Sequence, residues 1–118
     1  ALFLRKDDYA KCLTLLPASV WNARLDSLRS ALRSKNPGAA AAIFRQYVKD
    51  TEEIQLDGNG RFLISKEFIA HAELQQAVCF VGTDGSIELW NADNLNASMM
   101  SAEDYRAALD GLDTSLIF

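Results

Sequence analysis

A break of three residues, Asn-Pro-Gly at 36–38, separates two helical segments and constrains the fold more than any other feature. Residues 17–35 open with a proline, which suits a first helical turn, and carry apolar residues at helical spacing from Trp21 to Leu32. Residues 39–50 form a second, alanine-rich segment that closes with basic Lys49 near its end. Because the break is so short, the two helices are expected to pack as a helical hairpin.

Strand-like runs lie on both sides of this hairpin. Asp84-Gly85 between two of them is a strong signal for a tight β-turn. A helical turn is expected near 66–74, and a capping-box-like sequence that starts at Ser101 predicts a last helix. The tail at 113–118 is ambiguous. The strand-like runs are 1–4, 12–16, 52–56, 61–65, 77–82 and 86–90. The pattern predicts an α+β, β-rich fold.

Two of these segments share one plan. "CLTLLPASVW" and "SIELWNADNL" each contain an alternating strand, a small polar break and a helix start with a large apolar residue. When they are aligned, Leu13 and Leu15 fall on Ile87 and Leu89. This faint repeat indicates that each half of the molecule is a copy of one β–α–β unit.

The charge is distributed unevenly along the chain. At 118 residues and 49% hydrophobic content, the chain is one compact unit whose net charge of −4 argues against indiscriminate nucleic-acid binding. Residues 1–49 hold nine Lys/Arg and three Asp, a net charge of +6. Residues 50–118 hold three Lys/Arg and thirteen Asp/Glu, a net charge of −10. Such asymmetry marks either a face for an acidic partner or contacts between subunits.

The titratable residues do not form a pattern typical of a metal, cofactor or catalytic site. Cys12 and Cys79 lie in apolar runs and are expected to be buried, reduced thiols, and His71 is expected on a helix surface. The segment from Asp57 begins like a calcium loop, but Phe62 and Phe68 replace the required glycine and glutamate. No nucleophile–base pair is visible, so we expect no enzyme, no metal and no cofactor.

The candidate site is the turn formed by Asp57, Gly58, Asn59, Gly60 and Arg61, between the strand-like runs 52–56 and 61–65. One interpretation is a hairpin with a surface salt bridge worth under about 1 kcal/mol. The other is a stiff, glycine-rich loop in which Asp57 accepts the turn amides and Arg61 is a planar donor for phosphate or guanine. The residues alone leave both open.

A family resemblance favours the second interpretation. Residues 52–68, followed by 78–91, resemble the second half of the MraZ family, within the AbrB/MazE superfamily. The mark of that family is a twice-repeated Asp-x-x-x-Arg turn in a "DxKGRxxxP" pattern, which Asp57, Gly60 and Arg61 match. Two departures are Asn59 in place of the usual lysine and Ser65 in place of the usual proline. The first could weaken phosphate contact, and the second could loosen the start of the next helix.

The resemblance extends over roughly 1–95. Residues 5–28 are similar to the end of the family's first half, and 43–48 to the phenylalanine-rich helix before its second half. It therefore implies that 1–50 hold the end of the first repeat plus the helical hairpin. Residues 51–118 would hold the second repeat plus a C-terminal helix. We also expect an N-terminal segment before Ala1 that carries its own Asp-x-x-x-Arg turn.

The family implies a double-split, swapped-hairpin β-barrel with the helical hairpin packed outside. It also implies a cytoplasmic, nucleoid-associated repressor without a membrane anchor. This protein would form a ring-like homo-oligomer that binds DNA repeats upstream of its own cell-division and cell-wall gene cluster through residues 57–61. The alternative is an antitoxin-like or other protein-interaction module of the same barrel class, in which the acidic helix from Ser101 binds a partner protein.

Overall fold

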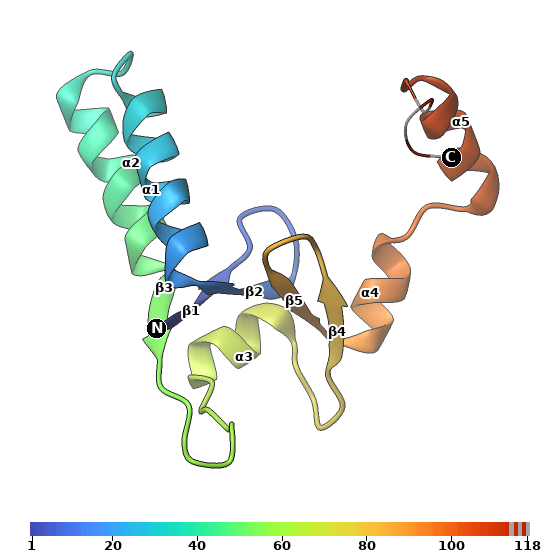
Figure 1. Cartoon of the computed structure of the whole chain (residues 1–118), viewed down its shortest axis with the longest axis horizontal. Helices are drawn as coiled ribbons and strands as arrows, with labels where there is room; N and C mark the ends of the chain where they lie inside the picture. The colour runs from blue at the N-terminus through green and yellow to red at the C-terminus, as the bar shows by residue number, and fades with distance from the viewer. Residues whose placement is uncertain (114, 116, 118) are drawn as a thin grey trace.

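The computed structural model describes residues 1–113, 115 and 117, so the ambiguous tail at 113–118 lies partly outside the described residues. The described residues form five strands and five helices (Figure 1). The elements are β1 Leu2–Lys6, β2 Cys12–Pro17, α1 Ala18–Leu32, α2 Pro37–Lys49, β3 Thr51–Ile54, α3 Lys66–Ala72, β4 Cys79–Gly82, β5 Ile87–Trp90, α4 Ala92–Ser98 and α5 Ala102–Asp110. The α+β class is confirmed.

The strands form one antiparallel sheet in the order β3-β1-β2-β5-β4. Two hairpins, β1–β2 and β4–β5, meet at its centre through β2 and β5. The second hairpin turns at Asp84 and Gly85, which have φ angles of 55° and 84°. These left-handed conformations are those that a two-residue hairpin turn requires, so the prediction from Asp-Gly is confirmed.

The register at the centre of the sheet shows how the two copies of the internal repeat are arranged. Leu13 lies opposite Leu89, and Thr14 lies opposite Glu88. The sequence alignment that places Leu13 on Ile87 also places Thr14 on Glu88, so equivalent residues of the two copies face each other. A local two-fold axis therefore passes between Thr14 and Glu88 and relates the two hairpins.

The main core lies between the sheet and α3, which covers one face of it (Figure 1). Its buried residues are Leu4, Leu13, Ile54, Phe68, Ala72 and Leu89. On the opposite face, the rings of Phe3, Trp21 and Tyr47 stack in series, with centroid separations of 5.6 Å at each step. This stack fixes the base of α1 and α2 on β1.

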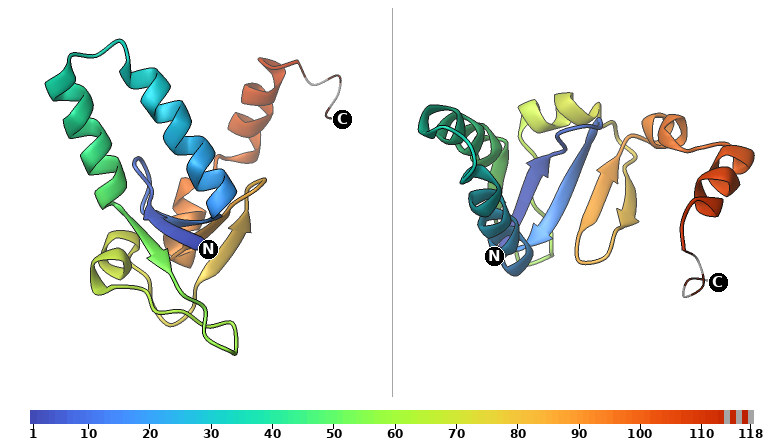
Figure 2. Two further views of the ribbon diagram at one scale, coloured as in Figure 1. Left: turned by 60° about the vertical axis from the view of Figure 1, so that its left-hand side comes forward. Right: turned by 90° about the horizontal axis from the view of Figure 1, so that it is seen from above.

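The helical hairpin of α1 and α2 is confirmed, but it packs little against the rest of the molecule. Trp21 is the one buried residue of α1, and no residue of α2 is buried. The hairpin projects from one end of the sheet, and the arm formed by α4 and α5 projects from the other (Figure 2). The expected last helix is also confirmed, since the Ser101 side chain caps α5 by accepting a hydrogen bond from the Asp104 amide.

The strand expected over 61–65 is absent from the structure. β3 ends at Ile54 and pairs with β1, while 61–65 follow the turn without ladder pairing. The alternation is nevertheless real, because Phe62 and Ile64 pack against the core and Leu63 between them is 93% exposed. The period-two pattern thus predicted which side chains face inward but not the hydrogen-bonding partner.

Both cysteines are free thiols, with Cys12 buried and Cys79 half-buried. His71 is half-buried and not on the open surface as expected; its Nε2 atom is buried and makes no hydrogen bond to a described residue. Over the part of the chain that the structure describes, no helix is long and apolar enough to span a membrane.

Candidate nucleic-acid interface

The turn from Asp57 to Arg61 is closed by its own backbone. The Asp57 amide donates to the Arg61 carbonyl oxygen at 2.8 Å, and the Gly60 amide donates to the Asp57 carbonyl oxygen at 3.1 Å. Gly60 has a φ of +76°, in the left-handed region that disfavours other residues. A Cβ at Gly58 or Gly60 would meet no atom within 4 Å, so conformation and not space requires glycine at position 60.

The Asp57 carboxylate holds the turn from within. Its Oδ1 atom accepts the Asn59 amide at 2.8 Å and the Arg61 amide at 2.9 Å. The backbone hydrogen bond from Arg61, followed by that from Asn59 and the guanidinium contact, holds the pKa of Asp57 below its ordinary value. The carboxylate is therefore ionised at neutral pH and stiffens the loop, as the second sequence interpretation expects.

Arg61 is fixed at one end of its guanidinium and open at the other. Its Nε donates to Asp57 Oδ2 at 3.0 Å, and its side chain is 74% exposed. Its two terminal nitrogens donate to no described residue. Both remain available to a bidentate acceptor such as a phosphate or the O6/N7 edge of guanine.

The loop is carried on anchored flanks and projects beyond the sheet at the end of β3 (Figure 1). Ile54 before it is buried in the core, and Phe62 after it packs against the same core. The five predicted site residues, 57–61, are contiguous and all exposed, with Gly58 and Asn59 at the tip. The structure thus brings the predicted residues together on one protruding loop.

Ser65, one of the departures from the family pattern, stands at the N-cap of α3. Its side chain makes no capping hydrogen bond, and its buried Oγ has no partner among the described residues. A proline at this position would bring no hydroxyl to bury, so the unbonded Ser65 hydroxyl agrees with the expectation of a looser start of α3.

A second arginine–aspartate pair, Arg5 with Asp8, was not anticipated from the sequence. Arg5 is 2% exposed, and its guanidinium carbon lies 3.8 Å from the centroid of the Tyr47 ring. Its terminal nitrogens donate to Asp8, to the Tyr47 carbonyl oxygen and to Thr51 Oγ1. Its place in a polar run "RKDDYAK" gave no signal of burial.

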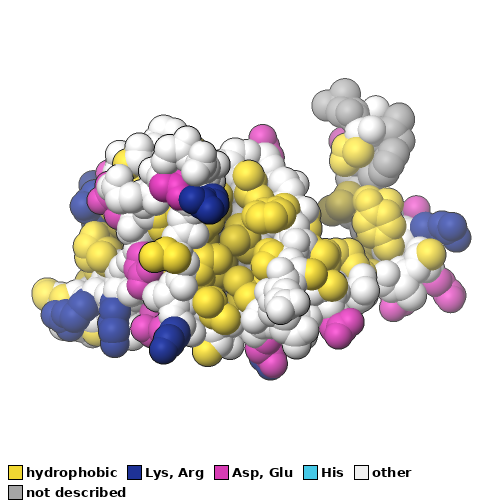
Figure 3. Space-filling view, turned by 90° about the horizontal axis from the view of Figure 1, so that it is seen from below, with side chains coloured by type: hydrophobic (Ala, Val, Ile, Leu, Met, Phe, Trp, Pro, Cys, Tyr) yellow, Lys and Arg dark blue, Asp and Glu magenta, His cyan; other side chains and the backbone are white. Residues whose placement is uncertain are grey.

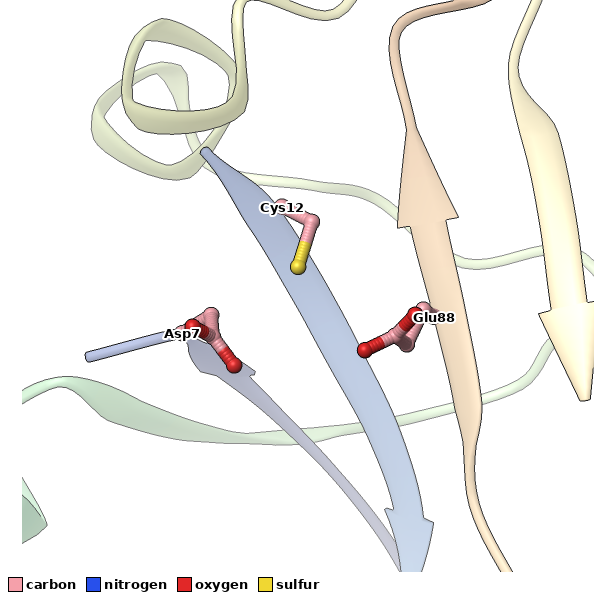
Figure 4. A group of neighbouring side chains, drawn as sticks. All are labelled: Asp7, Cys12 and Glu88. Carbon is pink, nitrogen blue, oxygen red and sulfur yellow. The ribbon is translucent and has the colours of Figure 1, made fainter. Parts of the chain in front are cut away.

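One further group of polar side chains comes together, although sequence reasoning expected no ligand cluster. The ligand atoms of Asp7, Cys12 and Glu88 lie within 4.8 Å of one another (Figure 4). Asp7 accepts the amides of Tyr9 and Ala10, and Glu88 accepts the indole N–H of Trp90. Burial, followed by these two carboxylates, raises the pKa of the Cys12 thiol to about 12. These contacts give both carboxylates structural roles, and a protonated thiol is a poor metal ligand.

These observations describe an α+β chain in which two β-hairpins, each followed by a helix, form one sheet and a stiff turn displays Arg61. The family model described as "MraZ protein, putative antitoxin-like" matches residues 47–110, which is more than half of the chain. The chain belongs to the MraZ family, so the resemblance noted in the sequence is confirmed.

Individual relatives agree with this assignment. The chain is 44% identical over 109 residues to the "Transcriptional regulator MraZ" of Phocaeicola vulgatus, covering 92% of this chain and 70% of the relative. The protein of the same name from Bacteroides thetaiotaomicron is 41% identical over 92% of this chain and 69% of its own length. A third, from Nitrosospira multiformis, is 34% identical over 92% of this chain and 71% of its own length.

Proposed function

We propose that this protein is a DNA-binding transcriptional regulator whose turn at 57–61 contacts the duplex. The observation that carries the proposal is the Arg61 guanidinium, held at Nε by Asp57 with both terminal nitrogens free of described partners. The relatives named above carry the name of a transcriptional regulator. In this role Asp57 positions the arginine, Gly60 permits the turn, and Gly58 and Asn59 let the backbone approach DNA closely.

A single subunit with a net charge of −4 would hold DNA weakly. A ring-like homo-oligomer overcomes this weakness, because it places several arginine turns on successive DNA repeats and raises their effective concentration. The protein then acts as a repressor at repeats upstream of its own cell-division and cell-wall gene cluster. This role is non-enzymatic, requires no cofactor, and belongs to the cytoplasm and nucleoid.

We further propose that the sheet belongs to a double-split β-barrel made from two repeats, with 1–50 and 51–118 as their contributions. The local two-fold between Thr14 and Glu88 supports this. β3 covers the outer edge of β1, whereas the equivalent edge of β4 pairs with no described strand. Hydrophobic side chains gather on the face seen from below (Figure 3), and Phe80 of β4 is 66% exposed. A strand equivalent to β3 would cover that edge.

The antitoxin-like alternative rests on the arm of α4 and α5, which is acidic and extends away from the sheet (Figure 2). In that function the arm binds a partner protein and the turn at 57–61 has no nucleic-acid role. DNA binding by the wild-type protein separates the two functions.

The test is a mobility shift with a duplex from upstream of the protein's own gene, against a shuffled duplex of equal length and composition, across a salt series. The proposal expects preferential binding to the upstream duplex, with affinity falling steeply as salt rises because phosphate contacts release counterions. Equal binding to both duplexes, or none at low salt, would overturn it.

A further inference from the structure

The helix α5 has an apolar stripe that nothing in the described structure covers. Ala102, Tyr105 and Leu109 recur at helical spacing, and Leu112 continues the series just beyond the helix. No residue of α5 is buried, and Tyr105 and Leu112 are 53% and 61% exposed. The helix is nevertheless properly capped by Ser101. A formed amphipathic helix without a covered face needs a surface to pack on.

The helical hairpin offers such a surface. A shallow groove follows one stripe of α2, lined by Ala41, Phe44 and Val48 with Arg45 and Lys49 beside them. Val48 is 39% exposed, and Phe44 is half-buried. The groove is thus an apolar strip with cations on its rim.

The same apolar strip continues onto α1. Leu32 and Ala40 border Phe44 on that side together with two more arginines. Arg29 lies over the Phe44 ring, with its guanidinium carbon 5.3 Å from the centroid. Cations therefore border the apolar strip on both sides.

The charges of the two surfaces are complementary. Residues 18–49 hold six Lys/Arg against one Asp, whereas 92–113 hold five Asp/Glu against one Arg. Among the described residues, Arg33, Arg45 and Lys49 form no salt bridge. Contact between the acidic helix α5, which carries the apolar stripe, and the basic groove would neutralise charge on both surfaces.

The two surfaces lie at opposite ends of the same molecule (Figures 1 and 2). We propose that α5 of one copy packs its apolar stripe into the α1–α2 groove of a second copy. Because donor and acceptor are different surfaces, this contact is head-to-tail and can close into a ring. The inference rests on the homo-oligomer of the proposed function and names the elements that build it.

The first test uses the full chain with Tyr105→Ala and Leu109→Ala together. Since no residue of α5 is buried, these changes leave the fold intact, which circular dichroism verifies. Light scattering at micromolar concentration should give an assembly larger than a dimer for the wild type and the 13.0 kDa monomer for the variant. A variant that keeps the wild-type mass would overturn the inference, although the homo-oligomer itself would stand.

The second test is a charge exchange. Asp104→Lys with Asp110→Lys should break the assembly, and Arg33→Glu with Arg45→Glu should break it equally. Mixing the two double variants should restore the wild-type mass, because each chain then supplies the charge that the other lacks. Failure to reassemble on mixing would overturn the pairing of α5 with the hairpin.

These outcomes are distinguishable from failure of the DNA proposal. All the variants keep the turn at 57–61, whereas Arg61→Ala should lose DNA affinity while keeping the wild-type mass. A wild-type protein that is a monomer at micromolar concentration would overturn the inference. The contact of Arg61 with DNA would still be decided separately, by the DNA affinity of Arg61→Ala.

Discussion

Two arginine–aspartate pairs in this molecule have nearly the same ion-pair distance and opposite surroundings. Arg5 and Asp8 approach to 2.9 Å, and Arg61 and Asp57 approach to 3.0 Å. The Arg5 side chain is 2% exposed, whereas that of Arg61 is 74% exposed. The spacing is three residues in one pair and four in the other.

The pairs differ in how many guanidinium donors they use. Arg5 donates through both terminal nitrogens and stacks on Tyr47, so it ties β1 to α2 and to Thr51 at the start of β3. Arg61 donates to its aspartate through Nε alone among the described residues. Donor use, and not the presence of a salt bridge, separates the structural arginine from the one free to bind a ligand.

The largest effect on stability is expected for Arg5→Ala. It removes the hydrogen bond to Thr51 Oγ1 and one of the two to the Tyr47 carbonyl oxygen, which keeps the one from Thr51 Oγ1, and it opens a void in a buried site. The free energy of unfolding should fall by about 3 kcal/mol. Urea unfolding measures this, with Arg61→Ala as the control that changes it by under about 1 kcal/mol. Equal losses in both variants would remove the distinction between the pairs.

The next effect is expected for Gly60→Ala, since the new side chain must adopt a φ of +76°. The cost should be about 1 kcal/mol in the free energy of unfolding. Gly58→Ala is the matched control, because a Cβ there meets nothing within 4 Å and the position is not in the left-handed region. Similar denaturation midpoints for the two variants would show that the turn is not held in this conformation.

A smaller change in stability is expected for Asp57→Ala. The amides of Asn59 and Arg61 lose their acceptor, so hydrogen exchange at these two positions should accelerate. The melting temperature should stay close to that of the wild type, because the pair is exposed, while DNA affinity falls partially. Unchanged exchange at both amides would mean that Asp57 does not order the loop.

The smallest effect concerns pH. Because the pKa of Asp57 is lowered in the folded state, its contribution to the turn is complete above 3.8, the ordinary aspartate value, and is lost as pH falls through the lowered value. The turn should therefore be insensitive to pH between 5 and 8. An NMR titration of the Asp57 carboxyl carbon should give a midpoint below 3.8; a midpoint above it would contradict the hydrogen-bonded turn.

The sequence predicted most elements where local chemistry decides the structure. Asp84-Gly85 formed the tight turn as expected, whereas the break between the helices lies at 33–36, because Asn36 caps α2 and Pro37 and Gly38 belong to its first turn. The pairing of strands was harder to predict. Phe62 and Ile64 are partly buried at strand-like spacing, yet their segment forms no hydrogen-bonded ladder with another described strand. Alternation reports burial and not pairing.

The candidate site shows the same difference between what nearby residues decide and what distant partners decide. The turn from Asp57 to Arg61 was predictable, since glycine and aspartate form it within five residues. The buried role of Arg5 was not, because its partners Tyr47 and Thr51 are more than forty residues away in the chain. The proposed covering of the apolar stripes on α2 and α5 by a second molecule is likewise absent from any local pattern.

The most direct test of the account is the DNA affinity of Arg61→Ala beside that of Lys11→Ala, measured by fluorescence anisotropy with the upstream duplex at physiological salt. Lys11 is the matched control, an exposed cation in an ion pair with Glu73 at 3.1 Å. We expect a loss of tenfold or more for Arg61→Ala, because each such contact is worth roughly 1–3 kcal/mol. Lys11→Ala should change the affinity little, and both variants should keep the wild-type mass. Wild-type affinity in Arg61→Ala would contradict the account and leave the turn as a hairpin loop.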